Sequence, residues 1–184
     1  TFQALLDLVF AWDRQRTAFA LDVGQVDLVV MRGWYSATTF WSPEHFRRYV
    51  APYVRQLARL AHEAGCLFGY TVTTGVMPVL DDFAALGVDL LYYADPAQGG
   101  MDLRVAKAKL GGKVAMAGGV NSGVTLHHGT PDEVRQQVHE AIRTLGPGGG
   151  FILSPVDALF PDTPWHNVQA MIEAWRELCN YPIH

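Results

Sequence analysis

Five short apolar runs alternate with helical segments along the whole chain, and this alternation constrains the fold more than any other feature. The runs occupy residues 26–31, 66–72, 88–93, 113–117 and 151–153. Runs that are almost continuously apolar are typical of strands buried on both faces of a parallel sheet. No hairpin turn joins two of them, so each connection crosses over through a helix in the right-handed sense. The sequence therefore predicts an α/β fold built on a parallel sheet.

The helices of this pattern begin at recognisable caps. Ser42-Pro43-Glu44 supplies a capping serine, a proline suited to the first turn and an acid at the positive end of the helix dipole. Thr130-Pro131-Asp132-Glu133 is a capping box. We expect helices over residues 2–21, 43–64, 78–86, 102–110, 134–145 and 163–175. Because no linker or low-complexity segment divides them, we expect residues 1–184 to belong to a single domain.

Two architectures accommodate five parallel strands, namely an open doubly wound sheet and a (β/α)8 TIM-type barrel. No glycine-rich dinucleotide loop follows the first strand, which removes the strongest argument for the doubly wound sheet. A closed barrel typically needs about 250 residues, so this chain would supply only about five βα units of one. Thr1 is not a methionine and helical periodicity begins at Phe2, so we expect the chain to be cut from a longer polypeptide. Five strands alone leave two open edges, which we expect the missing barrel half or a second copy to cover.

Composition excludes several classes of partner. Hydrophobic residues make up 49% of the chain and charged residues 17%, as in a globular protein. The net charge is −4 and no basic stripe occurs, which argues against nucleic acid as a partner. No apolar run is long enough to suggest a membrane span. Cys66 and Cys179 lie far apart and do not suggest a disulfide framework, so a cytoplasmic location is the default expectation.

Polar and aromatic side chains follow each predicted strand. In a parallel barrel, the strand C-termini and the loops after them build the active site. The candidates are Arg32 and Trp34 after the first strand, Tyr70, Thr71 and Thr73 at the second, Tyr93 and Asp95 at the third, Asn121 after the fourth, and Ser154 and Asp157 at the fifth. We expect Asp157, Arg32 and Tyr93 to be catalytic and the other seven to contact substrate. Asp157 is the strongest candidate because it is an acid in a loop directly after an apolar strand.

A purely structural interpretation stands beside this one. Arg32 can be a surface charge, Thr71 and Thr73 can serve as strand formers, and Asp95 precedes a proline, where it can form a turn. The chain contains no H-E-x-x-H, no C-x-x-C and no nucleophile elbow. The sequence therefore predicts no metal ligands.

Several short motifs follow one another in the order and at the spacing of a known family. They are Ser42-Pro43-Glu44 with Ala51-Pro52-Tyr53, Leu86-Gly87-Val88-Asp89, Met116-Ala117-Gly118-Gly119-Val120, Gly129-Thr130-Pro131-Asp132-Glu133-Val134, Gly148-Gly149-Gly150-Phe151-Ile152-Leu153-Ser154-Pro155 and Asp162-Thr163-Pro164. On these motifs the chain resembles the C-terminal half of the uroporphyrinogen decarboxylase superfamily. The resemblance implies a (β/α)8 barrel. It also implies the chemistry of one of two branches, the haem-pathway decarboxylase or the corrinoid-linked methyltransferases.

The chain departs from both branches at the positions that carry their chemistry. In the methyltransferase branch, a His-x-Cys-Gly-Asn segment and a later cysteine bind zinc, which activates a thiol substrate. The aligned segment here is Thr71-Val72-Thr73-Thr74-Gly75, and Asp157 takes the place of the later cysteine. Two threonines and an aspartate are a poor zinc donor set, which disfavours zinc. Asp157 also takes the place of a histidine of the decarboxylase branch, whose anion-binding groups lie mainly in the family's N-terminal half.

The resemblance and its departures lead to three hypotheses. The first is a divergent methyltransferase-like member that acts on a methyl donor or on a methyl group carried by a corrinoid, without the usual zinc site. A corrinoid protein would then be the partner that delivers the methyl group. The second is a uroporphyrinogen decarboxylase-like lyase acting on a tetrapyrrole in haem biosynthesis. The third is a non-catalytic binding module that kept the barrel and lost the reactive residues.

Overall fold

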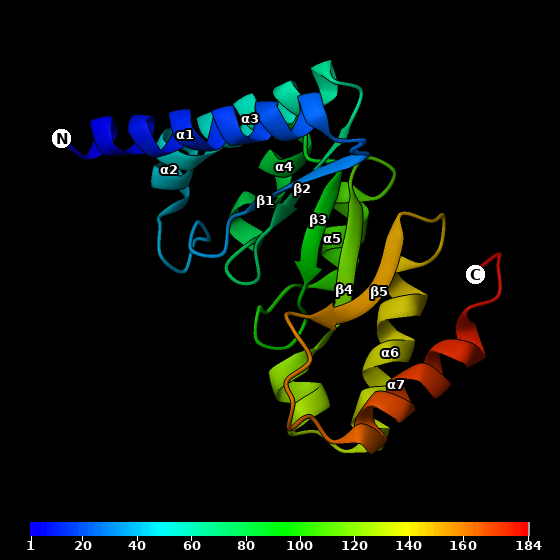
Figure 1. The fold of residues 1–184 in the computed structure, drawn as a ribbon. Coiled ribbons are helices and arrows are strands. Elements are labelled where there is room, and N and C mark those ends of the chain that lie inside the picture. The colour runs from blue at the N-terminus through cyan, green and yellow to red at the C-terminus, as the bar shows by residue number, and fades with distance from the viewer. Residues whose placement is uncertain (184) are drawn as a thin grey trace.

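A computed structural model describes residues 1–183 and shows a five-stranded parallel sheet in the order β1-β2-β3-β4-β5 (Figure 1). The strands are β1 (Leu28–Arg32), β2 (Leu67–Thr71), β3 (Leu90–Ala94), β4 (Ala115–Asn121) and β5 (Phe151–Val156). Each strand pairs in parallel with the next one along the chain. The predicted α/β fold with a parallel sheet is therefore confirmed, and its shape is that of a partial barrel.

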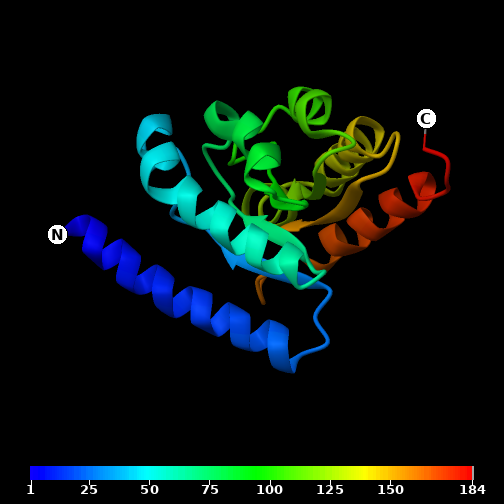
Figure 2. The same ribbon diagram turned by 90° about the horizontal axis from the view of Figure 1, so that it is seen from above.

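Helices connect the strands, and most of them cover one face of the sheet. They are α1 (Phe2–Val23), α2 (Pro43–His45), the π-helical η1 (Phe46–Val50), α3 (Ala51–Glu63), the 3-10 helix η2 (Met77–Val79), α4 (Leu80–Leu86), α5 (Leu103–Leu110), the π-helical η3 (Ser122–His127), α6 (Pro131–Leu145) and α7 (Trp165–Leu178). The row from α3 to α6 lies on one side of the sheet, with α1 and α7 at its two ends (Figure 2). The capping box of α6 forms as predicted, since Glu133 accepts from Thr130 N at 2.7 Å and Thr130 accepts from Glu133 N.

The core lies between the sheet and this row of helices. Phe68 and Tyr70 of β2, Leu91 of β3 and Met116 of β4 all point to the helices and are at most 1% exposed. The ring of Tyr70, for example, lies 5.8 Å from that of Phe83 on α4. Burial of each large side chain stabilises the fold by about 1.5–3 kcal/mol relative to leaving it in water. The alternating strand residues thus fix which face of the sheet the helices cover.

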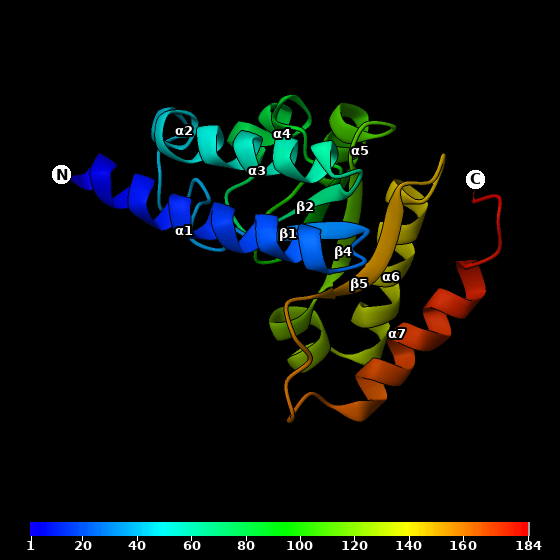
Figure 3. The same cartoon turned by 45° about the horizontal axis from the view of Figure 1, so that its top comes forward.

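The opposite side of the sheet, which we call the open face, is left largely uncovered (Figure 3). Strand alternation and register place Leu28, Val30, Arg32, Leu67, Gly69, Thr71, Leu90, Tyr92 and Ile152 on it. A methyl group built on Gly69 would lie 3.2 Å from Val30 and 3.5 Å from Tyr92, which confirms that these residues share one face. Val30 is 40% exposed, Leu67 56% and Ile152 54%. In a closed barrel this face would line the interior.

Helix α1 forms where periodicity predicts it, but its apolar positions are not buried. None of its residues is buried, and Trp12 remains 60% exposed. Both polar and apolar contacts to α3 hold it. The Tyr53 hydroxyl donates to Asp7 at 2.7 Å, the Gln3 amide donates to the Tyr53 oxygen at 2.7 Å, and the ring of Phe10 lies 4.6 Å from that of Tyr53. The physical reason is that the sheet ends at β1, so α1 has no strand beneath its outer side.

The last two strands extend farther than their apolar runs predict. β4 continues through Gly118 and Gly119, whose φ angles of 139° and 97° suit glycine, and ends at Asn121 rather than at residue 117. The glycine pair keeps its register, with Gly118 opposite Leu153 and Gly119 opposite Ser154. The apolar run predicts that the strand ends at residue 117, before the glycines, whereas the backbone continues through them to Asn121.

Candidate functional site

The C-terminal ends of the five strands meet at one edge of the sheet, because all five run in the same direction. Arg32, Thr71 and Asn121 are the last residues of β1, β2 and β4, and Tyr93 lies one residue before the end of β3. Asp157 follows the last residue of β5. This edge corresponds to the active-site mouth of a parallel barrel.

Tyr93 and Asp157 stand out at this edge by their backbone. Their φ angles are 79° and 69°, and among residues 1–183 they are the two non-glycine residues with positive φ. A left-handed conformation costs an ordinary residue about 1–2 kcal/mol. Such strain concentrates at active sites and ligand clamps, where the surrounding structure holds it in place. Two of the three residues predicted to be catalytic, Tyr93 near the end of β3 and Asp157 after β5, are thus the two that carry this strain.

The side chain of Tyr93 has aromatic and charged neighbours. Its ring lies 5.6 Å from that of Trp34 at an interplanar angle of 54°. Burial raises its pKa above the ordinary value, the charge of Asp157 and the neighbouring Tyr92 raise the pKa further, and the Arg32 guanidinium lowers it. The phenol is therefore protonated at neutral pH and can donate a hydrogen bond. We call Arg32, Trp34, Tyr93 and Asp157 the strand-end cluster.

Asp95 and Asn121 have a different environment from the strand-end cluster. They are 2% and 3% exposed, and the Asn121 amide donates to the Asp95 carboxylate at 2.8 Å. That carboxylate also accepts from Ala97 N at 3.0 Å and from Gly99 N at 2.8 Å, while the Asn121 oxygen accepts from Val124 N at 2.7 Å. Burial raises the pKa of Asp95, and these hydrogen bonds oppose the rise. The pair ties the loop after β3 to η3, which fits the turn-forming alternative for Asp95.

The second strand places its three candidates in different surroundings. Tyr70 is completely buried on the helix side, with its hydroxyl hydrogen-bonded to Ser36, and burial raises its pKa to about 12. Its predicted contact with substrate does not fit this position. Thr71 is 5% exposed at the end of the open face, and its carbonyl accepts from Gly33 N at 2.9 Å. Thr73 is partly buried in the loop beyond.

Ser154, the remaining candidate, lies within β5 rather than after it. It pairs with Gly119, and its hydroxyl is buried without a hydrogen-bond partner among the described residues. A buried hydroxyl without a partner is destabilising unless a water molecule or ligand satisfies it. Ser154 therefore stays a candidate for substrate contact on structural grounds.

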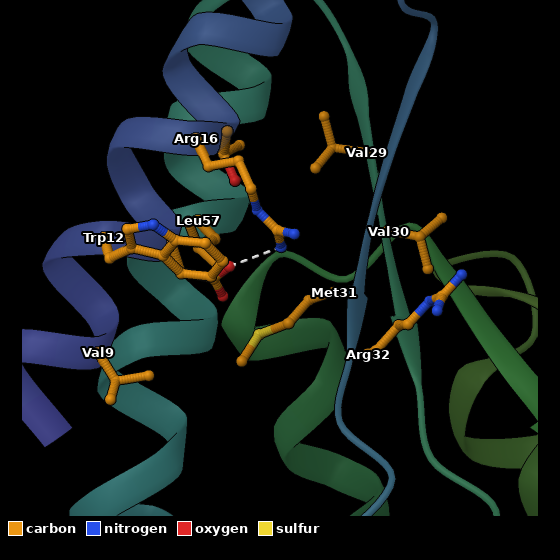
Figure 4. Close-up of a pocket in the computed structure, with 10 residues that line it drawn as sticks. Val9, Trp12, Arg16, Val29, Val30, Met31, Arg32 and Leu57 are labelled. Atoms are coloured by element: carbon orange, nitrogen blue, oxygen red, sulfur yellow. Dashed lines mark hydrogen bonds and ion pairs between the residues drawn. The ribbon is translucent and has the colours of Figure 1, made fainter.

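A groove of about 590 Å³ runs along the free edge of β1, beneath α1 (Figure 4). Val29 and Met31 extend from β1 toward the helices, whereas Arg32 extends from the other side of the strand. Arg16 lies on the α1 wall, bonded to Asp13 at 2.7 Å. Arg32 thus belongs both to this groove and to the strand-end cluster. The groove could not be predicted from the sequence, because its walls come from α1, β1 and α3, and a local pattern carries no signal for how such elements pack.

Neither a metal centre nor a membrane span is visible in the part of the chain that the structure describes. Among residues 1–183, no group of three or more His, Cys, Asp or Glu side chains is arranged to hold a metal ion. No described helix combines the length and the apolar character needed to cross a membrane. Cys66 is buried and Cys179 is partly exposed, and both are free thiols.

Comparison with known proteins adds to this geometry. The uroporphyrinogen decarboxylase (URO-D) family profile matches residues 18–178. The uroporphyrinogen decarboxylase of Pelodictyon phaeoclathratiforme is 23% identical over 172 residues, which cover 88% of this chain and 45% of that protein. That of Thermus thermophilus is 28% identical over 158 residues, covering 82% and 41%. That of Legionella pneumophila (strain Corby) is 36% identical over 77 residues, covering 42% and 21%.

A solved structure shares the fold. A methyltransferase from Methanosarcina mazei superposes with a TM-score of 0.70 at 22% sequence identity, over 85% of this chain and 43% of that one. The chain spans less than half the length of each of these relatives. Since the family profile covers most of the sequence, the chain belongs to the uroporphyrinogen decarboxylase family.

Proposed function

We propose that the chain forms the strand-end part of the active site of a methyltransferase-like enzyme, which takes a methyl group from a small donor or from a corrinoid delivered by a partner protein. The observation that carries the proposal is the strand-end cluster, in which two strained residues, a cation and an aromatic pair gather at one mouth. The motifs Ser154-Pro155 and Asp162-Thr163-Pro164 also resemble the methyltransferase branch more than the decarboxylase branch.

The chemistry of the cluster suits the release of a leaving group. When a methyl group leaves a nitrogen, oxygen or sulfur atom of a small donor, that atom keeps the bonding electron pair and benefits from protonation by a positioned acid. Tyr93 is our candidate for this acid because its phenol lies at the strand-end mouth, where the charges of Asp157 and Arg32 act on it. The Asp157 carboxylate would orient the polar end of the substrate, and Arg32 would bind an anionic group. Trp34 would pack against the apolar part of the substrate.

Zinc does not fit this site. Thr71, Thr73 and Asp157 offer two neutral hydroxyls and one carboxylate where the resemblance would place imidazole and thiolate donors. Thr71 is also buried. We therefore assign no step to a metal-activated thiol.

The test follows an isotope-labelled methyl group from small methylated amines, alcohols and thioethers to cob(I)alamin, which is used as the corrinoid probe and accepts the methyl group on cobalt. It uses the longest natural polypeptide that contains the chain. Tyr93→Phe should slow transfer by about 10²–10⁴-fold, the usual contribution of a general acid. Arg143→Gln on α6, which the structure places outside the cluster, should leave the rate unchanged. A protein that neither binds the corrinoid nor transfers a methyl group to it from any of these donors would overturn the proposal.

A second candidate is a uroporphyrinogen decarboxylase-like lyase, favoured by the names of the curated relatives. In that reaction Arg32 would bind a substrate carboxylate and Tyr93 would supply the proton that replaces carbon dioxide. Release of carbon dioxide from uroporphyrinogen, lost in Tyr93→Phe, would select this candidate. Binding of either probe without turnover would instead select a binding module.

A further inference from the structure

The position of Tyr93 depends on an irregularity in the pairing of β3 with β4. Tyr92 pairs with Ala117 and Ala94 pairs with Gly118, so Tyr93 has no partner on β4. One extra residue in one of two paired strands is the mark of a β-bulge, which re-aims a side chain and is frequent beside active sites. Tyr93 is that extra residue, with φ at 79°.

Directly opposite the bulge, Gly118 leaves room that no other residue would leave. Its φ is 139°, and a methyl group at its Cα would lie 2.7 Å from both the nitrogen and the oxygen of Ala94. Real Cβ atoms essentially never approach backbone atoms this closely. The Ala94 nitrogen belongs to the peptide group that joins Tyr93 to Ala94. Any side chain at position 118 would therefore displace the peptide that sets the direction of Tyr93.

We propose that Gly118 is a positioning residue for Tyr93: its missing side chain lets β4 lie against the bulge and thereby sets the direction of the phenol, whose ring lies 5.6 Å from that of Trp34. The importance of this device for catalysis rests on the proposed function, whereas the device itself does not. Two observations on the bulge support it. Tyr93 is one of the two non-glycine residues with positive φ among residues 1–183. Gly118, which lies opposite it, also has a positive φ.

Asp95 fixes the bulge from its other side. It lies two residues after Tyr93, is 2% exposed, and its carboxylate accepts three hydrogen bonds, from Ala97 N, Gly99 N and the Asn121 amide. The chain after the bulge therefore cannot move freely, so a shift forced by a side chain at position 118 has to appear at Tyr93. The orientation of Tyr93 is thus set by one glycine and one buried carboxylate, neither of which is in the strand-end cluster.

The experiment measures the ionisation of Tyr93 in the unliganded protein. For each protein background, phenolate absorbance is titrated against pH with and without the additional substitution Tyr93→Phe. The difference between the two titration curves gives the pKa of Tyr93. The backgrounds are wild type, Gly118→Ala and Gly112→Ala. Gly112 is a matched control, because it has a positive φ of 75° but nothing within 4 Å of a methyl group built on it. Asp157→Asn is then added to each background.

In wild type and Gly112→Ala, Asp157→Asn should lower the pKa of Tyr93, because it removes a charge that raises it. In Gly118→Ala the pKa should already lie closer to the ordinary value of 10.0, and the response to Asp157→Asn should disappear. If Gly118→Ala keeps both the pKa and the full response, Gly118 serves only strand packing and the proposal is wrong.

A second variant covers the case in which Gly118→Ala does not fold. Asp95→Asn weakens the other anchor of the bulge without adding volume, and it should reduce the response of Tyr93 to Asp157→Asn. An unchanged response there contradicts the proposal. Because the titration needs no substrate, it distinguishes this device from the proposed function. A protein without methyl transfer can still show the coupling, and an active one can lack it.

Discussion

The carboxylate of Asp157 raises the pKa of Tyr93, although the two residues belong to β3 and to the loop after β5, with β4 between them. Both residues hold a left-handed backbone. Two strained positions, one within β3 and one in the loop after β5, thus interact electrostatically, and Arg32 acts on Tyr93 with the opposite charge. Such coupling between a phenol and a carboxylate at a strand-end mouth is the physical basis of the first prediction.

Two substitutions that remove charges of opposite sign should move the pKa of Tyr93 in opposite directions. Asp157→Asn should lower it and Arg32→Gln should raise it, because each removes one charge that acts on the phenol. Asparagine tolerates the left-handed conformation, so the first change leaves the backbone in place. Phenolate absorbance against pH, corrected with Tyr93→Phe, measures both shifts. Asp132→Asn on α6 is the control, since its side chain is 95% exposed and bonds only to Arg135. Shifts of the same sign would contradict the assigned neighbours.

The raised pKa of Tyr93 also predicts how stability depends on pH. The folded state holds this proton more tightly than the unfolded chain, whose phenol titrates near 10.0. The contribution of Tyr93 is therefore complete below that pH and is lost as the pH rises through the folded value. Urea unfolding of wild type and Tyr93→Phe from pH 8 to 11 measures it. If the stability difference between the two proteins stays constant over this range, the phenol is not perturbed in the folded state.

The strain at Asp157 should appear when glycine and alanine are compared at that position. Glycine adopts φ near 69° without steric cost, whereas alanine does not. Asp157→Ala should therefore be less stable than Asp157→Gly by about 1 kcal/mol. Chemical denaturation of both variants gives the difference directly. The reverse order would show that the left-handed backbone does not persist in solution.

The capping box of α6 should contribute measurably to stability. Thr130→Ala removes the side chain that accepts from Glu133 N and should destabilise the protein by about 1 kcal/mol. Thr130→Ser keeps the hydroxyl and should restore most of this loss. Thermal and urea unfolding of the pair provide the measurement. An equal loss in both variants would assign the effect to the threonine methyl group rather than to the cap.

The open face should drive self-association when nothing covers it. Leu67 and Ile152 are more than half exposed there, and apolar strand surfaces with free edges promote association. Sedimentation velocity should show a mass that rises with concentration, and the double variant Leu67→Gln with Ile152→Gln should reduce the rise. Val105→Gln, on the solvent side of α5, should not. A wild-type chain that stays a monodisperse monomer would contradict this view of the face.

Much of the architecture was predictable because it depends on local patterns. The apolar runs locate all five strands, and capping residues such as Ser42 and Thr130 locate helix starts, since both signals act within a few residues. Strand ends were less predictable. Gly118 and Gly119 resemble a strand terminator in sequence, yet tertiary pairing with β5 lets them extend β4.

The sequence could predict that the candidate site lies at one edge of the sheet, but it could not predict which side chains come together there. The common direction of the strands was enough to gather Arg32, Tyr93 and Asp157 at one edge. Sequence could not show that Tyr70 points to the helices, because one residue of register reverses the face of a strand side chain. Nor could it separate Asp95, whose carboxylate is used by its own loop, from Asp157.

By itself, the sequence determined the order of strands and helices, the parallel sheet and the family, because these follow from periodicity, caps and ordered motifs. Only the tertiary structure decided that Tyr93 lies on a bulge facing the charge of Asp157, and that Gly118 makes room for it. The reason is physical: a bulge arises from the mismatch between two paired strands, and neither strand encodes that mismatch alone.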